Sequence, residues 1–295
     1  MAGRDDASAV FRLLGESRYS HIHVDWYVPG DWLGTPGFVV WDTAVSSETP
    51  PFNPLAQLSQ STLAACLAVA ADPLPAAWVR VAAVREPVDV LEAVGRMLNH
   101  VLPWLVETAV TELAWLPIAP WPNDVLPQLG FQQVNAIETY VKHGMDIPPI
   151  PDVPGLAIHP VQTSDMANLA KLEEEAFDPI WRHSAQSLLL ARPQTISFDV
   201  AFVEGEAAGF QFSTQSQQGA HLVRLTVHPK FQGKGVGSAL LAHALEGYKQ
   251  RGIYLATLNT QLDNTASQHL YQKFGFEPNG HRLPIWSLPV VKMRD

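Results

Sequence analysis

Residues 222–241 read LVRLTVHPKFQGKGVGSALL, and this stretch decides the fold. Its first six residues are mostly apolar or β-branched, which predicts a buried strand that Pro229 brings to an end. Glycines at 233, 235 and 237 follow, and a helical apolar stripe begins at Val236. A strand, a glycine-rich turn and a helix N-terminus in this order expose successive backbone N–H groups, which predicts a binding site for a pyrophosphate.

The glycine spacing excludes two common phosphate loops. A dinucleotide-binding fingerprint reads G-x-G-x-x-G, and a P-loop reads G-x-x-x-x-G-K-[ST]. Here the spacing is G-x-G-x-G, and Lys234 is followed by Gly235. A different phosphate-binding loop is therefore indicated.

A second motif, NTASQHLYQKFGF, occupies residues 264–276. It follows a predicted strand over Tyr254–Leu258 and precedes a Gly-Phe turn. Ala266, Leu270 and Phe274 are spaced four apart, which predicts a helix with these three residues on its buried face.

Together the two motifs resemble the GNAT acetyltransferase superfamily, whose acyl-CoA loop reads Q/R-x-x-G-x-G/A and whose later helix and turn read N-x(6)-Y-x(3)-G-F. The resemblance covers residues 155–295. It implies an α/β fold with a mixed sheet, acetyl-CoA as co-substrate and no metal. Because the first half of the chain shares the same outline, the fold class expected is two GNAT-like acyl-CoA N-acyltransferase domains in tandem.

The resemblance also implies roles for individual residues. Pantetheine would pair like an extra strand with the main chain at Leu225, Thr226 and Val227. Tyr271 would be the catalytic acid that protonates the departing CoA thiolate, although it could also be a plain core aromatic. The other residues implied in cofactor binding are the loop Gln232, Gly233, Lys234, Gly235, Val236, Gly237 and Ser238 for the pyrophosphate, and Asn264 for pantetheine.

The general base is not indicated by the resemblance. Ribosomal-protein N-acetyltransferases of the superfamily carry a glutamate in the strand before the asparagine, where this chain has Asn259, which cannot accept the proton. Glu204, Glu206 and His221 lie near predicted strand ends and are candidates, as is a path of water to bulk solvent. Each of the three is equally well explained as an ordinary surface residue.

A proline-rich segment divides the chain. Residues 146–155 read DIPPIPDVPG, and four prolines in ten residues favour an extended spacer. The expected division is a first domain over residues 1–146, a linker over 147–154 and a catalytic domain over 155–295.

The first half repeats the order of the second at an offset of 144–145 residues, which indicates a duplication. The repeat lacks the chemistry, because the glycine loop falls on Glu86 to Glu92, with three carboxylates and no glycine. Tyr271 falls on Leu126 and Asn264 on about Ala119. The first half is expected to be a degenerate GNAT-like domain that shapes or covers the acceptor site, with an unrelated α/β scaffold as the alternative.

Composition excludes several classes of protein. Of 295 residues, 47% are hydrophobic and 16% charged, as in ordinary globular proteins. The longest apolar run, Leu63–Ala71, is too short to cross a bilayer, and Cys66 is the single cysteine. With no secretory signal pattern, these features predict a cytoplasmic protein without membrane attachment. The formal net charge of −10 argues against a nucleic-acid partner.

Three smaller features have ordinary explanations. His21, His23 and Asp25 alternate along Tyr19–Val28, which would put three potential metal ligands on one strand face; a polar strand face without metal is the preferred interpretation. Cys66 is expected to be a small buried hydrophobe. Trp26, Trp32 and Trp41 are expected in the core, with an acceptor pocket as the alternative.

The function expected is transfer of acetyl from acetyl-CoA to a primary amine of a small molecule or peptide, by direct attack in a ternary complex. Mycothiol synthase is a tandem member of the superfamily, so an amino-sugar conjugate is one acceptor that the resemblance allows. The alternative is a non-catalytic module that binds or senses acetyl-CoA. Residues 1–150 hold 7 basic and 16 acidic residues, which favours a cationic acceptor by electrostatic steering. The sequence does not indicate an oligomeric state.

Overall fold

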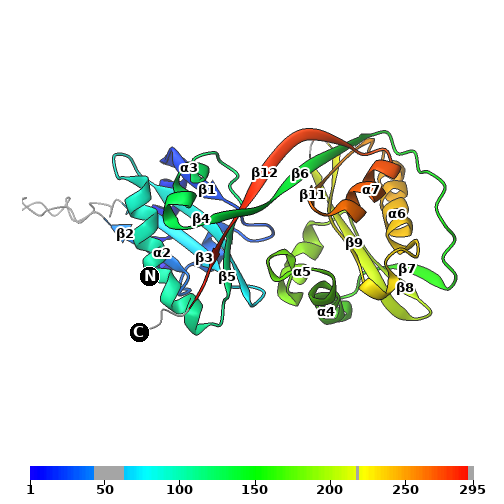
Figure 1. Cartoon of the computed structure of the whole chain (residues 1–295), viewed down its shortest axis with the longest axis horizontal. Coiled ribbons are helices and arrows are strands. Elements are labelled where there is room, and N and C mark those ends of the chain that lie inside the picture. The colour runs from blue at the N-terminus through cyan, green and yellow to red at the C-terminus, as the bar shows by residue number, and fades with distance from the viewer. Residues whose placement is uncertain (43–62, 217–218, 292–295) are drawn as a thin grey trace, which may run out of the picture. The chain divides into compact units, whose positions relative to one another are not determined.

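The computed structural model describes residues 1–42, 63–216 and 219–291 and divides into two compact units (Figure 1). Unit 1 contains residues 1–134 and the C-terminal segment from Ile285, and unit 2 contains residues 135–284. Each unit is a mixed sheet with helices packed on it, which is the α/β class that the sequence predicts.

Unit 1 has the strand order β2-β3-β4-β5-β12, with β1 also paired to β4. Every side chain of β3 is buried, because α1 covers one face of the sheet and α2 covers the other. The Leu63–Ala71 run is therefore a central strand, and Cys66 is buried in it as predicted. The elements are α1 (Ala7–Glu16), β1 (Tyr19–Ile22), β2 (Phe38–Asp42), β3 (Leu63–Ala70), β4 (Ala76–Val84), α2 (Val90–Glu107), β5 (Glu112–Trp115), α3 (Pro122–Val125) and the 3₁₀ turns at Arg4–Asp6, Pro29–Trp32 and Leu126–Leu129.

Unit 2 has the strand order β6-β11-β10-β9-β8-β7, with the first part of β12 beside β6. The helix predicted after the glycine loop is α6, and all six residues of its apolar stripe are buried: Val236, Leu240, Leu241, Ala244, Leu245 and Tyr248. The elements are β6 (Gln132–His143), β7 (Leu156–Pro160), α4 (Met166–Ala176), α5 (Ala185–Ala191), β8 (Ser197–Val203), β9 (Glu206–Ser216), β10 (Gly219–Val227), α6 (Val236–Gln250), β11 (Leu255–Gln261), α7 (Thr265–Lys273), β12 (Glu277–Pro289) and the 3₁₀ turns at Thr163–Asp165, Pro179–Trp181, Arg192–Gln194 and Pro229–Phe231.

Two long strands each begin in one unit and end in the other. β6 continues from unit 1 and pairs along β11 of unit 2, with Tyr140 opposite Leu258. The last part of β12 pairs with β5 of unit 1, with Trp286 opposite Trp115. The divisions between the units therefore fall at residues 134/135 and 284/285, and the predicted linker over 147–154 lies wholly within unit 2.

The predicted buried stripe of the last helix needs a correction. Phe274 is buried as expected, but Ala266 is exposed, because α7 begins only at Thr265 and Ala266 lies in its first turn. Tyr271 packs into the core in its place, against Tyr140 and Phe276.

Candidate functional site

The centre of unit 2 is a gap in strand pairing between β10 and β11. These parallel strands pair only at residues 220–222 and 256–258, although β10 continues to Val227 and β11 to Gln261. Within the described residues, β10 beyond Leu222 pairs with β9 alone, so that Leu225, Thr226 and Val227 lie opposite Gln211, Phe210 and Gly209. The backbone edge of β10 that faces β11 is thus left for an extended ligand.

A β-bulge at Val223 sets which side chains face which layer. The register shifts between Leu222 and Arg224. As a result, Leu222 and Leu225 pack on the α6 side, whereas Arg224 and Thr226 contact Glu173 of α4. The bulge therefore brings polar side chains to the α4 face at the point where the two strands part.

The glycine loop follows β10 directly. Gly235 has φ +92°, and a Cβ there would lie 2.9 Å from Cγ2 of Val153. Only glycine fits this combination of left-handed backbone and close contact. The first N–H groups of the 15-residue α6, from Val236 through Ser238, lack helical partners and carry the positive end of the helix dipole.

The proline-rich segment contributes to this loop and is more than a spacer. Pro151 and Val153 are the nearest neighbours of the position that a Gly235 side chain would occupy. Gln232 holds the other end of the loop, because its Nε2 donates to the Val227 carbonyl at 3.0 Å. The loop is therefore fixed on both sides before any ligand binds.

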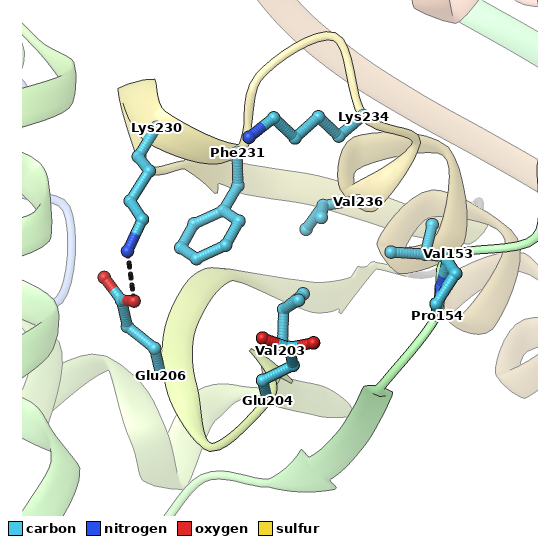
Figure 2. Close-up of a pocket in the computed structure, with 9 residues that line it drawn as sticks. All are labelled: Val153, Pro154, Val203, Glu204, Glu206, Lys230, Phe231, Lys234 and Val236. Carbon is cyan, nitrogen blue, oxygen red and sulfur yellow. Dashed lines mark hydrogen bonds and ion pairs between the residues drawn. The ribbon is translucent and has the colours of Figure 1, made fainter.

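Two lysines flank the loop at a cavity of about 420 Å³ (Figure 2). Lys230 forms an ion pair with Glu206, and the Nζ of Lys234 lies 5.8 Å from the centroid of the Phe231 ring. Glu206 offsets the charge of Lys230, so Lys234 is the lysine that contributes positive charge beside the N-terminus of α6.

Tyr271 lies on α7 and is almost fully buried. Burial raises the pKa of Tyr271 to about 12, while the positive charge of Arg224 and a hydrogen bond with Ser267 act in the opposite direction. The phenol is therefore protonated at neutral pH and can act only as a proton donor.

Asn264 is the N-cap of α7. Its Oδ1 accepts from the backbone N–H of Ser267 at 3.1 Å, and its Nδ2 lies 3.3 Å from Oε1 of Gln261. This helix-capping role accounts for Asn264 without any ligand, and the sequence motif alone did not indicate it.

Asn264 also borders a polar pocket of about 400 Å³ between the end of β11 and the segment that follows α4. Four carboxylates line this pocket against a single arginine, Arg182. The lining is completed by Asn135, Glu174, Glu175, Ala176, Phe177, Asp178, Trp181, Gln261 and Asp263.

A buried cluster around the carboxylate of Glu173 adjoins this pocket through Arg224, which contacts Trp181 of the pocket wall. Glu173 is completely buried and accepts hydrogen bonds from Arg224, Thr226 and His183. The sequence analysis did not single out Glu173, because it is the first of three consecutive glutamates, and such a run is typical of a solvent-exposed helix face. The available signal was periodicity, since Leu169, Leu172 and Glu173 share the buried stripe of α4.

The candidate bases lie in different places. Glu204 and Glu206 line the cavity beside the lysines. Asn259 is exposed and accepts from Thr139 Oγ1 at 2.9 Å. His221 is the middle one of the three β10 residues that pair with β11, its Nδ1 lies 2.8 Å from Thr257 Oγ1, and burial lowers its pKa.

Unit 1 has the same parting of strands, but a strand of the chain itself fills it. β4 and β5 pair only at residues 76–78 and 112–114, each number being 144 below its counterpart in unit 2. Beyond this point β1 pairs antiparallel with β4, from Tyr19 opposite Val84 to Ile22 opposite Val81. No glycine loop follows β4, and Leu126, which the 145-residue offset aligns with Tyr271, is buried.

The predicted strand over Tyr19–Val28 is shorter than expected. It ends at Ile22, since Asp25 turns the chain with φ 47° and forms an ion pair with Arg80. His21 is buried against Trp115, and burial lowers its pKa to about 3. In the described part of the chain, no three His, Cys, Asp or Glu side chains gather closely enough to hold a metal ion.

The three early tryptophans have separate environments. Trp32 is buried in the α1 core, as expected. Trp41 packs partly on the α2 core under the guanidinium of Arg96, and Trp26 is half-buried. No helix within residues 1–42, 63–216 and 219–291 has the length and apolar character needed to cross a membrane.

Comparison with known proteins finds acetyltransferases. Residues 166–276 match the profile of the Acetyltransferase (GNAT) family. A Bacillus subtilis protein, provisionally named a ribosomal protein bS18-alanine N-acetyltransferase, is 25% identical over 127 residues, which are 43% of this chain and 83% of that protein. Mycothiol acetyltransferase of Paenarthrobacter aurescens is 32% identical over 126 residues, which are 40% of this chain but only 34% of its own length.

Similarity over the whole chain is found at the level of fold. The structure of a tandem GNAT protein from the clavulanic acid biosynthesis pathway superimposes with a TM-score of 0.56 at 15% identity, and it covers 99% of this chain and 98% of its own. The expected tandem arrangement of two GNAT-like domains is thereby confirmed.

Proposed function

The chain belongs to the GNAT acetyltransferase family as an acyltransferase, and from this premise we propose that unit 2 transfers the acetyl group of acetyl-CoA to a primary amine. The observation that carries the proposal is the open backbone edge of β10, which leads straight into a fixed glycine loop. One extended ligand with a pyrophosphate at its end fits both features.

Acetyl-CoA would bind along this path. Its pantetheine would add to the free edge of β10 at Leu225, Thr226 and Val227, and its pyrophosphate would accept from the N–H groups of Gly233 to Ser238. Gln232 would keep the loop on β10, and Lys234 would supply positive charge. Asn264 would meet the pantetheine from the start of α7.

The reaction proceeds by direct attack in a ternary complex. The neutral amine nitrogen forms a bond to the thioester carbonyl carbon, the C–S bond breaks, and the CoA thiolate leaves. Tyr271 donates its proton to this sulfur and recovers one from solvent, so the products are an amide and free CoA thiol. With a phenol pKa of about 12 and a thiol near 8.5, the transfer is uphill by about 5 kcal/mol, so it must accompany C–S cleavage.

Of the three candidate bases, we propose His221. It lies on β10 one residue before the last position that pairs with β11, whereas Glu204 and Glu206 line the cavity beside the lysines. Its lowered pKa keeps the ring neutral at pH 7, and the Thr257 contact holds Nδ1 and leaves Nε2 to take the amine proton.

The acceptor would enter through the polar pocket beside Asn264. Its excess of carboxylates favours a positively charged acceptor, such as a polyamine, an aminoglycoside or a peptide amine. The names of the relatives support an amine acceptor of either a peptide or an amino-sugar type.

Unit 1 would not bind acetyl-CoA. β1 occupies the backbone edge that pantetheine would need, and Glu86, Asp89 and Glu92 lie where a phosphate loop would be. Like charges at that point repel a pyrophosphate. We therefore propose that unit 1 has a non-catalytic role.

Release of free CoA thiol from acetyl-CoA, measured across small amines, amino sugars, aminoglycosides and peptide N-termini, tests the proposal. Amine-dependent release that falls by about 10²–10⁴ in kcat for Tyr271→Phe supports the transferase. The matched control is Tyr248→Phe, which removes another buried hydroxyl of unit 2. Tight acetyl-CoA binding with no release for any amine, and equal affinity in Tyr271→Phe, would favour a sensing module instead.

A further inference from the structure

Glu173 is a buried charge with no role in the mechanism above. Its carboxylate is completely inaccessible to solvent, and burial alone would raise its pKa. The charge of Arg224 and the bonds from His183 and Arg224 outweigh burial and lower the pKa of Glu173 to about 2. The group is therefore ionised at all physiological pH values.

Arg224 forms a bidentate ion pair with this carboxylate. Its Nε donates to Glu173 Oε1 at 2.9 Å, and its NH2 group donates to Oε2. Thr226 donates to the same Oε1 at 2.7 Å. Arg224 and Thr226 share a strand face because they are two residues apart, and the bulge at Val223 turns that face away from the Leu222 side and toward Glu173.

The same arginine holds the wall of the acceptor pocket. Its NH2 group also donates to the Trp181 carbonyl at 2.6 Å, and its guanidinium carbon lies 3.7 Å from the centroid of the Phe177 ring. His183 is tied to Glu173 through its backbone N–H and its ring. Residues 177–183 are thus fastened to Arg224 of β10 at two points and to Glu173 of α4 at a third, and Phe177, Asp178, Trp181 and Arg182 line the pocket.

Arg224 also acts on the proposed acid. Its charge favours the ionised form of Tyr271 and opposes the effect of burial on that phenol. One guanidinium therefore touches the wall of the acceptor pocket and lies within electrostatic reach of the group that protonates the leaving sulfur.

We propose that Arg224, fixed by Glu173, is a positioning residue that holds segment 177–183 against β10 so that the acceptor amine meets the thioester. This inference rests on the proposed function, because it names how the same site orients its acceptor. A stability role alone is a poor explanation, since well-packed apolar residues stabilise a buried position at least as well as an ion pair does.

Three variants separate positioning from stability. Arg224→Gln and Glu173→Gln each leave one buried charge unpaired and are expected to lower the melting temperature, whereas the double variant removes both charges and regains much of it. Loss of acceptor alignment is expected to lower kcat/KM for the amine by about 10²-fold in all three. The Kd for acetyl-CoA is expected to change by less than about threefold, because neither substitution removes a group that we propose to contact the cofactor.

Arg251→Gln is the control, because Arg251 is an exposed arginine of unit 2 that donates to the Gly247 carbonyl. It removes the same charge and is expected to leave kcat/KM unchanged. A double variant that regains activity together with stability would overturn the proposal. So would a loss of acetyl-CoA affinity equal to the loss of amine kcat/KM.

Hydrogen exchange measured without substrates tests the fastening of residues 177–183 independently of whether the protein is a transferase. Faster exchange confined to residues 177–183 in Arg224→Gln and in the double variant supports the fastening, and unchanged exchange there overturns it. Absence of amine-dependent turnover in the unaltered protein would instead contradict the proposed transferase.

Discussion

The two units contain the same parting of parallel strands, and they differ in what lies next to the exposed strand edge. In unit 2, β10 beyond Leu222 is paired on one side only. In unit 1, the equivalent stretch of β4 is paired on both sides, because β1 joins it. The splayed pair is therefore a feature of the fold, and an open backbone edge is a feature of one unit.

The arginine at the parting shows the same divergence. Arg80 and Arg224 are 144 residues apart, and each is paired with a carboxylate from an earlier segment of its own unit. Arg224 meets Glu173 through two of its nitrogens, whereas the Nε of Arg80 is buried without a hydrogen bond. Of these two arginines, the one with no buried nitrogen left without a hydrogen bond is the one in the unit where we propose catalysis.

The largest effect is expected from a substitution that displaces the glycine loop of unit 2. Gly235→Val adds a side chain at φ +92° within 2.9 Å of Val153, so the loop must move. We expect acetyl-CoA affinity, measured by calorimetry, to fall by about 10²-fold or more as the loop N–H groups lose alignment. Gly252→Ala is the control, since Gly252 has φ +71° with no atom within 4 Å of the new Cβ. Equal loss in both variants would contradict this explanation.

A smaller effect is expected from loosening the strand that fills unit 1. His21 lies opposite Ala82 in the pairing of β1 with β4. Two residues later, the N–H of His23 donates a hydrogen bond to the Arg80 carbonyl. His21→Pro removes a strand donor, which we expect to lower the stability of unit 1 by about 1–3 kcal/mol. Chemical denaturation checks the loss, and calorimetry is expected to find the acetyl-CoA affinity of the chain unchanged. A change in that affinity would assign unit 1 a part in cofactor binding.

Acid sensitivity is expected to come from unit 2. The folded pKa of Glu173 is below its ordinary value of 4.5, so the unfolded chain binds the proton more readily. The stabilisation is fully present above about pH 5 and is lost as pH falls toward 2. Glu173→Gln is expected to flatten this part of the stability curve, measured by denaturation between pH 5 and 3. An unchanged slope in the variant would assign the acid sensitivity to other carboxylates.

The smallest effect expected is on acceptor capture. The carboxylates of the polar pocket attract a polyamine at low ionic strength, and salt screens this attraction over about 10 Å at 0.1 M. We expect kcat/KM for a polyamine to fall severalfold between low and physiological salt, while kcat changes little. Insensitivity to salt would remove the steering argument.

Much of this architecture follows from the sequence. Alternating glycines after an apolar strand predict the loop before α6, and the run of Val236 to Tyr248 predicts the helix that supports it. The sequence does not predict that β6 and β12 each begin in one unit and end in the other. Their partner strands are more than a hundred residues away, and such pairing leaves no local sequence pattern. Glu173 is hidden for a related reason, because its partner Arg224 is 51 residues away and faces it only through a bulge.

The most direct test of the central claim combines calorimetry with hydrogen exchange upon addition of acetyl-CoA. We predict one acetyl-CoA per chain, with protection of residues 223–227 and 233–238 and none of residues 79–84 or 86–92. Two molecules bound per chain, or protection along β4, would contradict the claim that only unit 2 presents an open strand edge to the cofactor.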